Sequence, residues 1–341
     1  VQWFMRYFAN RQDKHIGNTS CADVEGPLNR YYLPVSYSII FIVSLVGNTI
    51  SICIYVTKLR PWKSSSIIMV NLAVTDLLYA LALPFLVHYY SNLESWTLGD
   101  FMCRCVRFAF HFHLYGSILF LSCIAVFRYV AVVQPLRGKQ LQQRVWGITA
   151  CSVVWVIAAA ETAPMLAFIS LQAEGNHTSC LDFASTNQTS VREHSLVLTA
   201  LGYALPLVLV FICYIGIVRQ LTRGPSPSRF CRMRARRVIV LILVVFVMCF
   251  LPYHVLRVLR KETESGSTTQ CTTNTVKAAY IISRPLAGLN TFFNLALYTL
   301  SGDRFRRAFL SSFHCEHWVS KLKNLNQKRK MADRSRTKQK S

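Results

Sequence analysis

Seven apolar segments, each long enough to cross a lipid bilayer, constrain the fold of this chain more than any other feature. A membrane-spanning helix needs about 20 apolar residues. The segments run from Leu33 to Thr57, Ser66 to Tyr90, Phe101 to Val133, Val145 to Ser170, Ser195 to Thr222, Ala235 to Leu259 and Val276 to Leu300. Within lipid, segments of this length must satisfy their backbone hydrogen bonds internally, which favours helices over barrel strands. The sequence therefore predicts an all-α membrane protein, a bundle of seven transmembrane helices.

The composition agrees with a membrane protein and argues against a nucleic-acid-binding domain. Of the 341 residues, 52% are hydrophobic and 16% are charged, whereas soluble proteins contain about 25% charged residues. The formal net charge is +23, but the basic residues lie between apolar runs rather than on a polar folded surface. No predicted span carries a nucleophile beside a base or a cluster of metal ligands, so we expect no enzymatic activity, cofactor or metal.

The charges of the connecting segments predict the orientation of the helices. The connections at 58–63, 137–144 and 219–237 are rich in Lys and Arg, whereas the alternate connections carry Glu and Asp. The positive-inside rule therefore places the basic connections in the cytoplasm and the N-terminus outside. The glycosylation triplets that begin at Asn18, Asn176 and Asn187 all fall on the side predicted to be external.

The pattern divides the chain into four parts. We expect an extracellular segment at 1–30, the seven-helix domain at 31–302, an amphipathic juxtamembrane helix at 303–315 and a basic, disordered cytoplasmic tail at 316–341. Cys315 is either a palmitoylation site or an unmodified cysteine. The rival class is a carboxylate transporter, and the absence of an internal repeat disfavours it.

Ionisable side chains inside the predicted spans indicate functional sites, because they are costly to place in lipid. Arg107, His111 and Tyr115 recur every four residues and share one face of the third helix near its outer end. At the same height, the sixth and seventh segments carry His254, Arg257, Arg260, Lys261 and Arg284. If these faces converge, an outer cavity contains at least three guanidinium groups and two imidazoles.

The three arginines at 107, 257 and 284 allow two interpretations. Each could reach the lipid headgroups or pair with an acid. Alternatively, they bind an anion together, because arginine suits forked recognition of carboxylate or phosphate and clustered positive charge in a low-dielectric cleft needs an anion. We predict a small anionic ligand, with Asp182 as the counter-ion that pairs with Arg257 or Arg284 in its absence. His111 and His254 are either core histidines or ligand contacts.

Other polar residues lie deeper in the predicted bundle or at its inner end. Asn48, Asp76, Asn290 and Asn294 are at mid-bundle height, where they could simply hydrogen-bond neighbouring helices. Asp76 additionally needs a cation, a set of donors or a proton, and Glu161 on the fourth segment has no evident partner. Arg128, about 30 Å from Arg107 along the third helix, lies between Phe127 and Tyr129 with no adjacent carboxylate.

Four cysteines lie on the predicted external side, where disulfides form: Cys21, Cys103, Cys180 and Cys271. Four cysteines allow three pairings, and the spacing alone does not select one.

From Tyr31 to Phe313 the chain resembles the rhodopsin-like G-protein-coupled receptors. The resemblance is carried by Gly47-Asn48, the segment from Asn71 to Asp76, Cys103, Phe127-Arg128-Tyr129, Trp155, Pro206, Tyr214, the segment from Cys249 to Pro252, and the segment from Asn294 to Tyr298. Three positions depart from the family pattern. Phe127 replaces the usual acid, Phe250 the usual tryptophan and Leu295 the usual proline.

Within this family the segments 58–65, 99–103, 107–112 and 283–290 resemble the nucleotide and carboxylate receptor branch. The resemblance implies a plasma-membrane receptor for a dicarboxylate such as 2-oxoglutarate, coupled to a Gq-type G protein. It implies anion binding by Arg107, His111, Arg257 and Arg284, with Tyr90 and Arg260 as further contacts, and the disulfides Cys103–Cys180 and Cys21–Cys271. It implies roles in coupling and activation for Arg128, Tyr129, Tyr214, Asn294, Tyr298 and Asp76. Nucleotides, succinate and cysteinyl leukotrienes are the alternative ligands.

Overall fold

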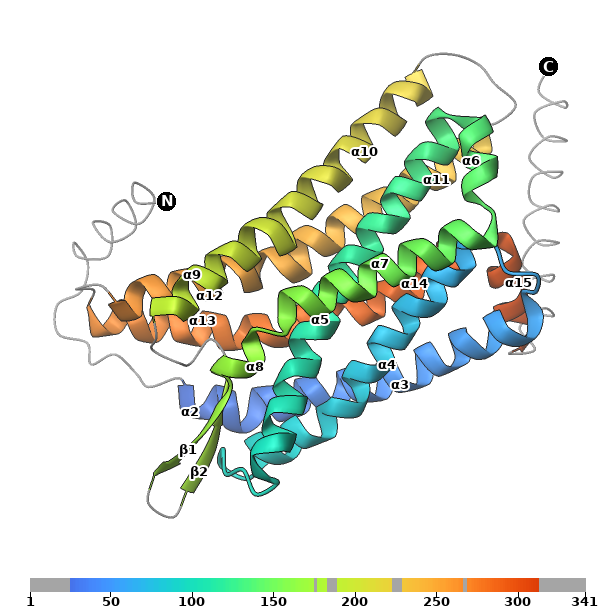
Figure 1. Cartoon of the computed structure of the whole chain (residues 1–341). Helices are drawn as coiled ribbons and strands as arrows, with labels where there is room; N and C mark the ends of the chain where they lie inside the picture. The colour runs from blue at the N-terminus through green and yellow to red at the C-terminus, as the bar shows by residue number, and fades with distance from the viewer. Residues whose placement is uncertain (1–24, 175–176, 183–188, 223–228, 266–268, 313–341) are drawn as a thin grey trace, which may run out of the picture.

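The computed structural model describes residues 25–174, 177–182, 189–222, 229–265 and 269–312. Its long helices run beside one another in an elongated bundle (Figure 1). The helices are α2 Glu25–Pro27, α3 Leu33–Lys58, α4 Ser64–Ser91, α5 Gly99–Val133, α6 Pro135–Leu141, α7 Arg144–Thr162, α8 Met165–Phe168, α9 Thr189–Thr199, α10 Leu205–Thr222, α11 Arg229–Val245, α12 Leu251–Ser265, α13 Gln270–Gly288, α14 Asn290–Ser301 and α15 Asp303–Ser312. Asn18, Cys21, Asn176, Asn187, Cys315 and the 316–341 tail lie outside the described residues.

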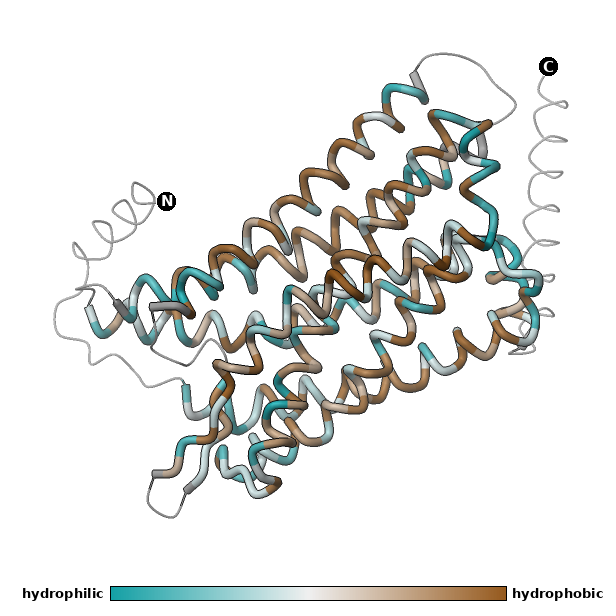
Figure 2. Tube along the Cα trace, viewed as in Figure 1, coloured by the Kyte–Doolittle hydropathy of each residue, from teal (hydrophilic) through white to brown (hydrophobic). Residues whose placement is uncertain are grey.

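The helical bundle predicted from the apolar segments is confirmed. Six continuous helical stretches of the described residues are long and apolar enough to cross a membrane. Figure 2 shows hydrophobic residues along the middle of the long helices and hydrophilic residues gathered toward their ends. The seventh segment forms α13 and α14, which are separated at Leu289, and it does not meet the same measure of length and hydropathy. The break leaves α14 with 12 residues, and α13 begins with the polar run from Gln270 to Thr275.

Three of the proline positions widen the helix just before them. Short π-helical segments at Leu28–Tyr32, Ala200–Ala204 and Phe246–Phe250 precede α3, α10 and α12, each of which has proline as its second residue. Proline cannot donate to the carbonyl four residues earlier, and its ring clashes with that carbonyl, so the preceding turn loosens. Pro84 and Pro285 remain inside α4 and α13, whereas α7 ends at Thr162, shortly before Pro164.

We call the two ends of the bundle the outer end and the inner end. The outer end carries an antiparallel hairpin of β1 Ser170–Glu174 and β2 His177–Leu181, which the sequence did not predict. The inner end carries α6 and α15 (Figure 1). Phe305 of α15 is buried against Tyr55, while Arg304, Arg306 and Arg307 are exposed, so α15 is the amphipathic helix expected from the sequence. Within the described residues it ends at Ser312.

Two contacts fix the hairpin on the outer end. Cys180 of β2 forms a disulfide with Cys103 of α5, with a Cα–Cα distance of 5.8 Å. The backbone N–H of Trp96 donates to the carbonyl of Thr178 over 2.7 Å. Together they hold Asp182, two residues after Cys180, inside the bundle, where its side chain is 4% exposed.

Candidate functional site

The three arginines of the outer end are buried, which excludes the interpretation that they reach lipid headgroups. Arg107 is 7% exposed, Arg284 is 7% exposed and Arg257 is 0% exposed. A guanidinium that reached toward the membrane surface would keep its charged end in water. The structure divides the three side chains into two groups with different partners.

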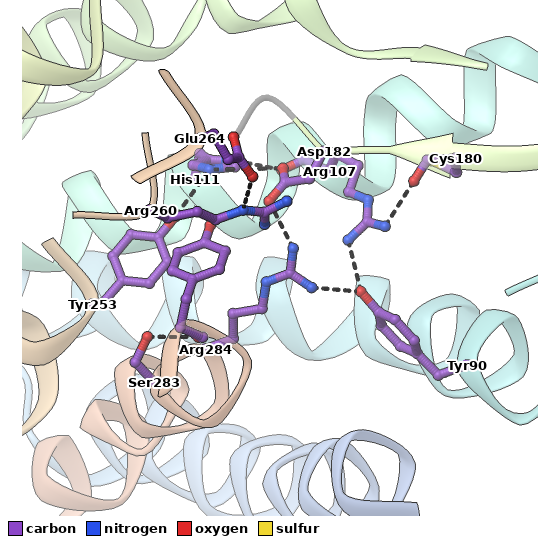
Figure 3. A network of polar contacts seen from close by, with 11 residues as sticks. Tyr90, Arg107, His111, Cys180, Asp182, Tyr253, Arg260, Glu264, Ser283 and Arg284 are labelled. Atoms are coloured by element: carbon purple, nitrogen blue, oxygen red, sulfur yellow. Dashed lines mark hydrogen bonds and ion pairs between the residues drawn. The ribbon is translucent and has the colours of Figure 1, made fainter. Parts of the chain in front are cut away.

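The first group joins Arg107 of α5 and Arg284 of α13 through Tyr90 of α4. The hydroxyl of Tyr90 accepts from Nη1 of Arg107 over 3.2 Å and from Nη1 of Arg284 over 2.8 Å. Nη2 of Arg107 also donates to the carbonyl of Cys180 over 2.8 Å. Figure 3 shows both guanidinium groups directed at the Tyr90 hydroxyl from different helices. Tyr90 therefore sets the separation of two like charges.

Asp182 is the acid of this first group. Its Oδ2 lies 3.3 Å from Nη2 of Arg284, so the pairing with Arg284 is the one found, and within the described residues no ion pair joins Asp182 to Arg257. Burial raises the pKa of Asp182, but the groups that face it, His111, Arg107 and Arg284, lower it to about 2. Its Oδ1 is buried and accepts no hydrogen bond from the described residues. The carboxylate is thus ionised yet only half satisfied.

His111 connects this acid to the sixth segment. Its Nδ1 lies 3.0 Å from the carbonyl of Arg107, and because a carbonyl can only accept, Nδ1 carries the hydrogen. Its Nε2 lies 3.2 Å from the hydroxyl of Tyr253, with which it forms a hydrogen bond. The same Nε2 lies 3.9 Å from Oδ1 of Asp182. The imidazole of His111 thus lies between Asp182 and Tyr253 of α12.

The second group is built around Arg257 of α12. Its Nη1 donates to the hydroxyl of Tyr115 over 2.8 Å, and its Nη2 donates to Oγ1 of Thr199 over 3.0 Å and, more weakly, to the carbonyl of Ser195 over 3.4 Å. All of these acceptors are neutral. No acidic side chain in the described part of the chain forms an ion pair with Arg257, and its Nε has no hydrogen-bond partner there. Among the described residues, Arg257 is thus a fully buried cation without a counter-ion.

His254 lies one turn before Arg257 and is also fully buried. Its Nδ1 donates to the carbonyl of Phe250 over 2.8 Å, and its ring stacks on Tyr203 at 4.4 Å. Its Nε2 is consequently an acceptor, and no described group donates to it. His254 thus packs in the core and has one buried polar atom that no described group satisfies.

Cationic side chains at the rim of the outer end form ion pairs with glutamates. Glu264 accepts from Nε of Arg260 over 2.9 Å and from Nζ of Lys261 over 3.2 Å. Arg192 and Glu262 form a partly exposed pair over 2.7 Å between α9 and α12. Arg260 lies over the ring of Tyr280 at 5.3 Å and close to the first group (Figure 3).

Asp76 of α4 is held at mid-bundle height by nitrogen donors from two helices. Nδ2 of Asn294 lies 3.0 Å from its Oδ2, and Nε2 of His113 lies 3.0 Å from its Oδ1. One step toward the inner end, the hydroxyl of Tyr298 donates to Oδ1 of Asn48 over 3.2 Å. The sequence interpretation overlooked His113, although it lies two residues after His111 on α5.

At the inner end Arg128 donates from Nη2 to the carbonyl of Ser301 over 2.8 Å, which links α5 to the end of α14. Tyr129 packs so closely on α10 that a Cβ at Gly216 would lie 2.2 Å from its ring. Tyr214 is half-buried on α10. Glu161 is half-buried on α7, and its Oε2 has no hydrogen-bond partner among the described residues.

The structure thus brings together Arg107, Arg284, Tyr90, His111 and Asp182, and it places Arg257 with Tyr115. Sequence reasoning missed Tyr253, Thr199 and Ser195 as polar partners. For Tyr253, its position directly after Pro252 was the one feature of the sequence that could have indicated a place in the site. Cys271 is disulfide-bonded, to a partner outside the described residues. Within the described ranges, no cluster of at least three His, Cys, Asp or Glu side chains could hold a metal ion.

A bundle of membrane-length helices, with a disulfide from α5 to a β-hairpin and buried polar side chains, is the architecture of a multi-pass membrane protein. Residues 47–298 match the 7 transmembrane receptor (rhodopsin family), and the chain belongs to this family of G-protein-coupled receptors, which are not enzymes. It is a multi-pass membrane protein.

Two groups of relatives are similar to the chain over most of its length. The 2-oxoglutarate receptor 1 of Rattus norvegicus is 47% identical over 298 residues, which cover 87% of this chain and 88% of the relative. The corresponding protein of Mus musculus is 46% identical over 302 residues, covering 88% and 89%. A purinoceptor of Homo sapiens is 36% identical over 292 residues, covering 84% and 78%.

Proposed function

We propose that this receptor binds a small dicarboxylate, with 2-oxoglutarate as the first choice, and signals through a Gq-type G protein. The observation that carries the proposal is the state of Arg257, a fully buried guanidinium whose partners among the described residues are all neutral. A buried charge without a counter-ion costs several kcal/mol. An anionic ligand at this position would recover that cost, which favours binding.

Two separate cationic positions suit a ligand with two negative ends. Arg107 and Arg284 form the first position, which Asp182 occupies with a half-satisfied carboxylate. Arg257 forms the second. One ligand carboxylate would replace Asp182 at Arg284. The other would meet Nε of Arg257, which has no hydrogen-bond partner among the described residues. The similarity to receptors whose names include 2-oxoglutarate supports this choice over a nucleotide, succinate or a cysteinyl leukotriene.

The same geometry suggests how binding reaches the inner end. Displacement of Asp182 changes the surroundings of His111, to which Tyr253 of α12 is hydrogen-bonded. The π-helical segment Phe246–Phe250 lies just below, where helix geometry is already loosened. A ligand shifts the equilibrium between an inactive and an active conformation only if it binds the two with different affinity. The ligand's surroundings at Asp182 and Arg257 must therefore differ between the inactive and the active conformation. A bound G protein should in turn raise the affinity for the ligand.

We place the outer end outside the cell at the plasma membrane and the inner end in the cytoplasm. The Cys103–Cys180 disulfide lies at the outer end, as expected for an oxidising compartment. The basic helix α15 lies at the inner end, in accordance with the positive-inside rule. In this orientation Arg128, Tyr129, Tyr214 and Tyr298 are positioned to serve G-protein coupling, and Asp76 and Asn294 to serve activation. Glycosylation at Asn18, Asn176 and Asn187 and the Cys21–Cys271 pair remain predictions.

Calcium release in cells that express the receptor tests the ligand. We expect 2-oxoglutarate to act at lower concentration than succinate, nucleotides or cysteinyl leukotrienes. Arg257→Gln should weaken the response at least 100-fold, because it removes one charged contact of about 3 kcal/mol. Arg192→Gln, which removes a partly exposed arginine of the rim, is the matched control and should change the response less than about fivefold. A response to nucleotides without one to dicarboxylates would overturn the proposal.

A further inference from the structure

Tyr280 of α13 is a fully buried tyrosine at the outer end, and its hydroxyl has no hydrogen-bond partner among the described residues. In contrast, the hydroxyls of Tyr90, Tyr115 and Tyr253 each form a hydrogen bond with an arginine or histidine of the site. A buried hydroxyl that lacks a partner is costly, and most such groups in folded proteins are satisfied. The hydroxyl of Tyr280 therefore indicates a partner beyond the described residues.

Tyr280 lies beside both cationic positions of the ligand site. Cζ of Arg284 lies 5.1 Å from the centroid of the Tyr280 ring, and Cζ of Arg260 lies 5.3 Å from it. On the side of α12, the ring of Tyr253 lies 5.7 Å from the Tyr280 ring, and Cζ of Arg257 lies 5.5 Å from the Tyr253 ring. The phenol of Tyr280 is close enough to interact electrostatically with both Arg284 and Arg257. It is thus a neutral polar group shared by the two cationic positions.

A ligand that bridges Arg284 and Arg257 presents the chain between its two carboxylates to this tyrosine. The arginines recognise the carboxylates, which are the same in every dicarboxylate of equal length. A phenol hydroxyl is a neutral donor, so it distinguishes an oxygen in the ligand chain from a methylene group. A site that forms a hydrogen bond with one ligand disfavours the analogue that lacks the bonded atom, because the polar group of the site is then left unpaired. Tyr280 is therefore placed to recognise what the arginines cannot.

We propose that the hydroxyl of Tyr280 donates a hydrogen bond to an oxo group on the chain between the two carboxylates of the ligand. Tyr280 thereby selects oxo dicarboxylates over dicarboxylates whose chain is unsubstituted. The inference rests on the proposed function, since it requires a dicarboxylate that reaches both Arg284 and Arg257. A ketone oxygen only accepts hydrogen bonds, and the Tyr280 hydroxyl has a proton that no described residue accepts.

The relative potency of 2-oxoglutarate and glutarate tests this proposal, because the two differ only in the oxo group. Calcium concentration–response curves are recorded for both ligands in cells that express the full-length receptor. The parent receptor should prefer 2-oxoglutarate about tenfold. Tyr280→Phe retains the ring beside Arg284 and removes the hydroxyl. It should weaken the response to 2-oxoglutarate about tenfold and change the response to glutarate less than about threefold, so the preference disappears.

Tyr79→Phe is the matched control. Tyr79 is also fully buried, and its hydroxyl also has no hydrogen-bond partner among the described residues, but its ring stacks on His113 beside Asp76 at mid-bundle height. The control should change the ratio of the two potencies less than about twofold, because its hydroxyl lies away from the arginines. Surface expression of each variant, measured in the same cells, shows that it folds.

Three results would overturn this inference while the dicarboxylate proposal stands. The first is equal potency of the two ligands on the parent receptor. The second is a ratio that Tyr280→Phe leaves unchanged, whether both responses weaken together or neither does. The third is an equal change of the ratio in Tyr79→Phe. A parent receptor that responds to neither ligand would instead overturn the proposed function, and this inference with it.

Discussion

At the scale of the residue, one buried carboxylate, Asp182, lies among the arginines of the outer end. Asp182 forms an ion pair with Arg284, one of the two arginines that Tyr90 holds together, and it forms no ion pair with Arg257 among the described residues. No described residue donates a hydrogen bond to its Oδ1. A fully satisfied carboxylate would be harder for a ligand to displace, because each lost charged hydrogen bond costs about 1.5 to 3 kcal/mol.

Replacement of Asp182 by Asn should therefore have two opposite effects. The ligand-free receptor should lose about 3 kcal/mol of stability, because a buried ion pair is broken and its cation remains. The dicarboxylate should bind about tenfold more tightly, because it no longer competes with an internal anion. Melting temperatures with and without 2-oxoglutarate, together with calcium concentration–response curves, measure both effects.

Asp100→Asn is the control for this substitution. Asp100 pairs with Arg104 on the same helix, but its side chain is 50% exposed, so both quantities should stay near those of the parent receptor. If Asp182→Asn leaves basal activity and agonist potency unchanged, Asp182 is not the counter-ion that the ligand displaces.

At the scale of the element, the π-helical segment before α10 lets two helices approach at the ligand site. Gly202 faces Tyr115 of α5, and a Cβ at this position would lie 2.6 Å from the ring. Tyr115 in turn accepts a hydrogen bond from Arg257. The position of Arg257 thus depends on a glycine from a third helix.

Gly202→Ala should shift the Tyr115 ring and weaken the dicarboxylate response by about tenfold, since overpacking of this kind costs about 1 to 3 kcal/mol. Gly116→Ala is the matched substitution, because its Cβ would meet Cγ2 of Thr75 at 3.5 Å, which is an ordinary contact. Calcium concentration–response curves at equal surface expression compare the two. Equal potency of the two variants would contradict the dependence of Arg257 on this contact.

At the scale of the whole molecule, the network around Asp76 joins three helices between the two ends. It links α4 to α5 through His113 and to α14 through Asn294, and all three side chains are at most 2% exposed. Any rearrangement of these helices must change a buried polar contact. Such contacts are expensive to leave unmade.

A double-mutant cycle tests the coupling between His113 and Asp76. His113→Leu should lower the melting temperature of the purified receptor markedly, because it removes a donor from a buried carboxylate. In an Asp76→Asn background, His113→Leu should lower the melting temperature much less, since the side chain that loses its partner is then a neutral amide. Ser122→Ala, which removes a hydroxyl bonded within its own helix, should have little effect. Additive effects of the two substitutions would exclude a specific interaction.

Much of the fold could be predicted because hydropathy and helical rise are properties of local sequence. The apolar segments indicated the order of the membrane-length helices. The spacing of Arg107 and Arg128 indicated that these two arginines lie near opposite ends of the third helix. The hairpin of β1 and β2 was missed, because ten residues with a short connection carry too weak an alternation. The break at Leu289 was missed as well, since Gly288 looks like the glycines that other membrane helices tolerate in their interior.

The sequence by itself determined that buried cations lie in the outer part of the bundle, because their costly positions can be read from the apolar segments around them. Only the tertiary structure decided that these cations form two groups, each with its own hydrogen-bond partners. Asp182 lies 102 residues from Arg284, and Tyr115 lies 142 residues from Arg257. These pairings follow from how the helices cross and where one disulfide holds a loop, and neither is encoded in the spacing along any single helix.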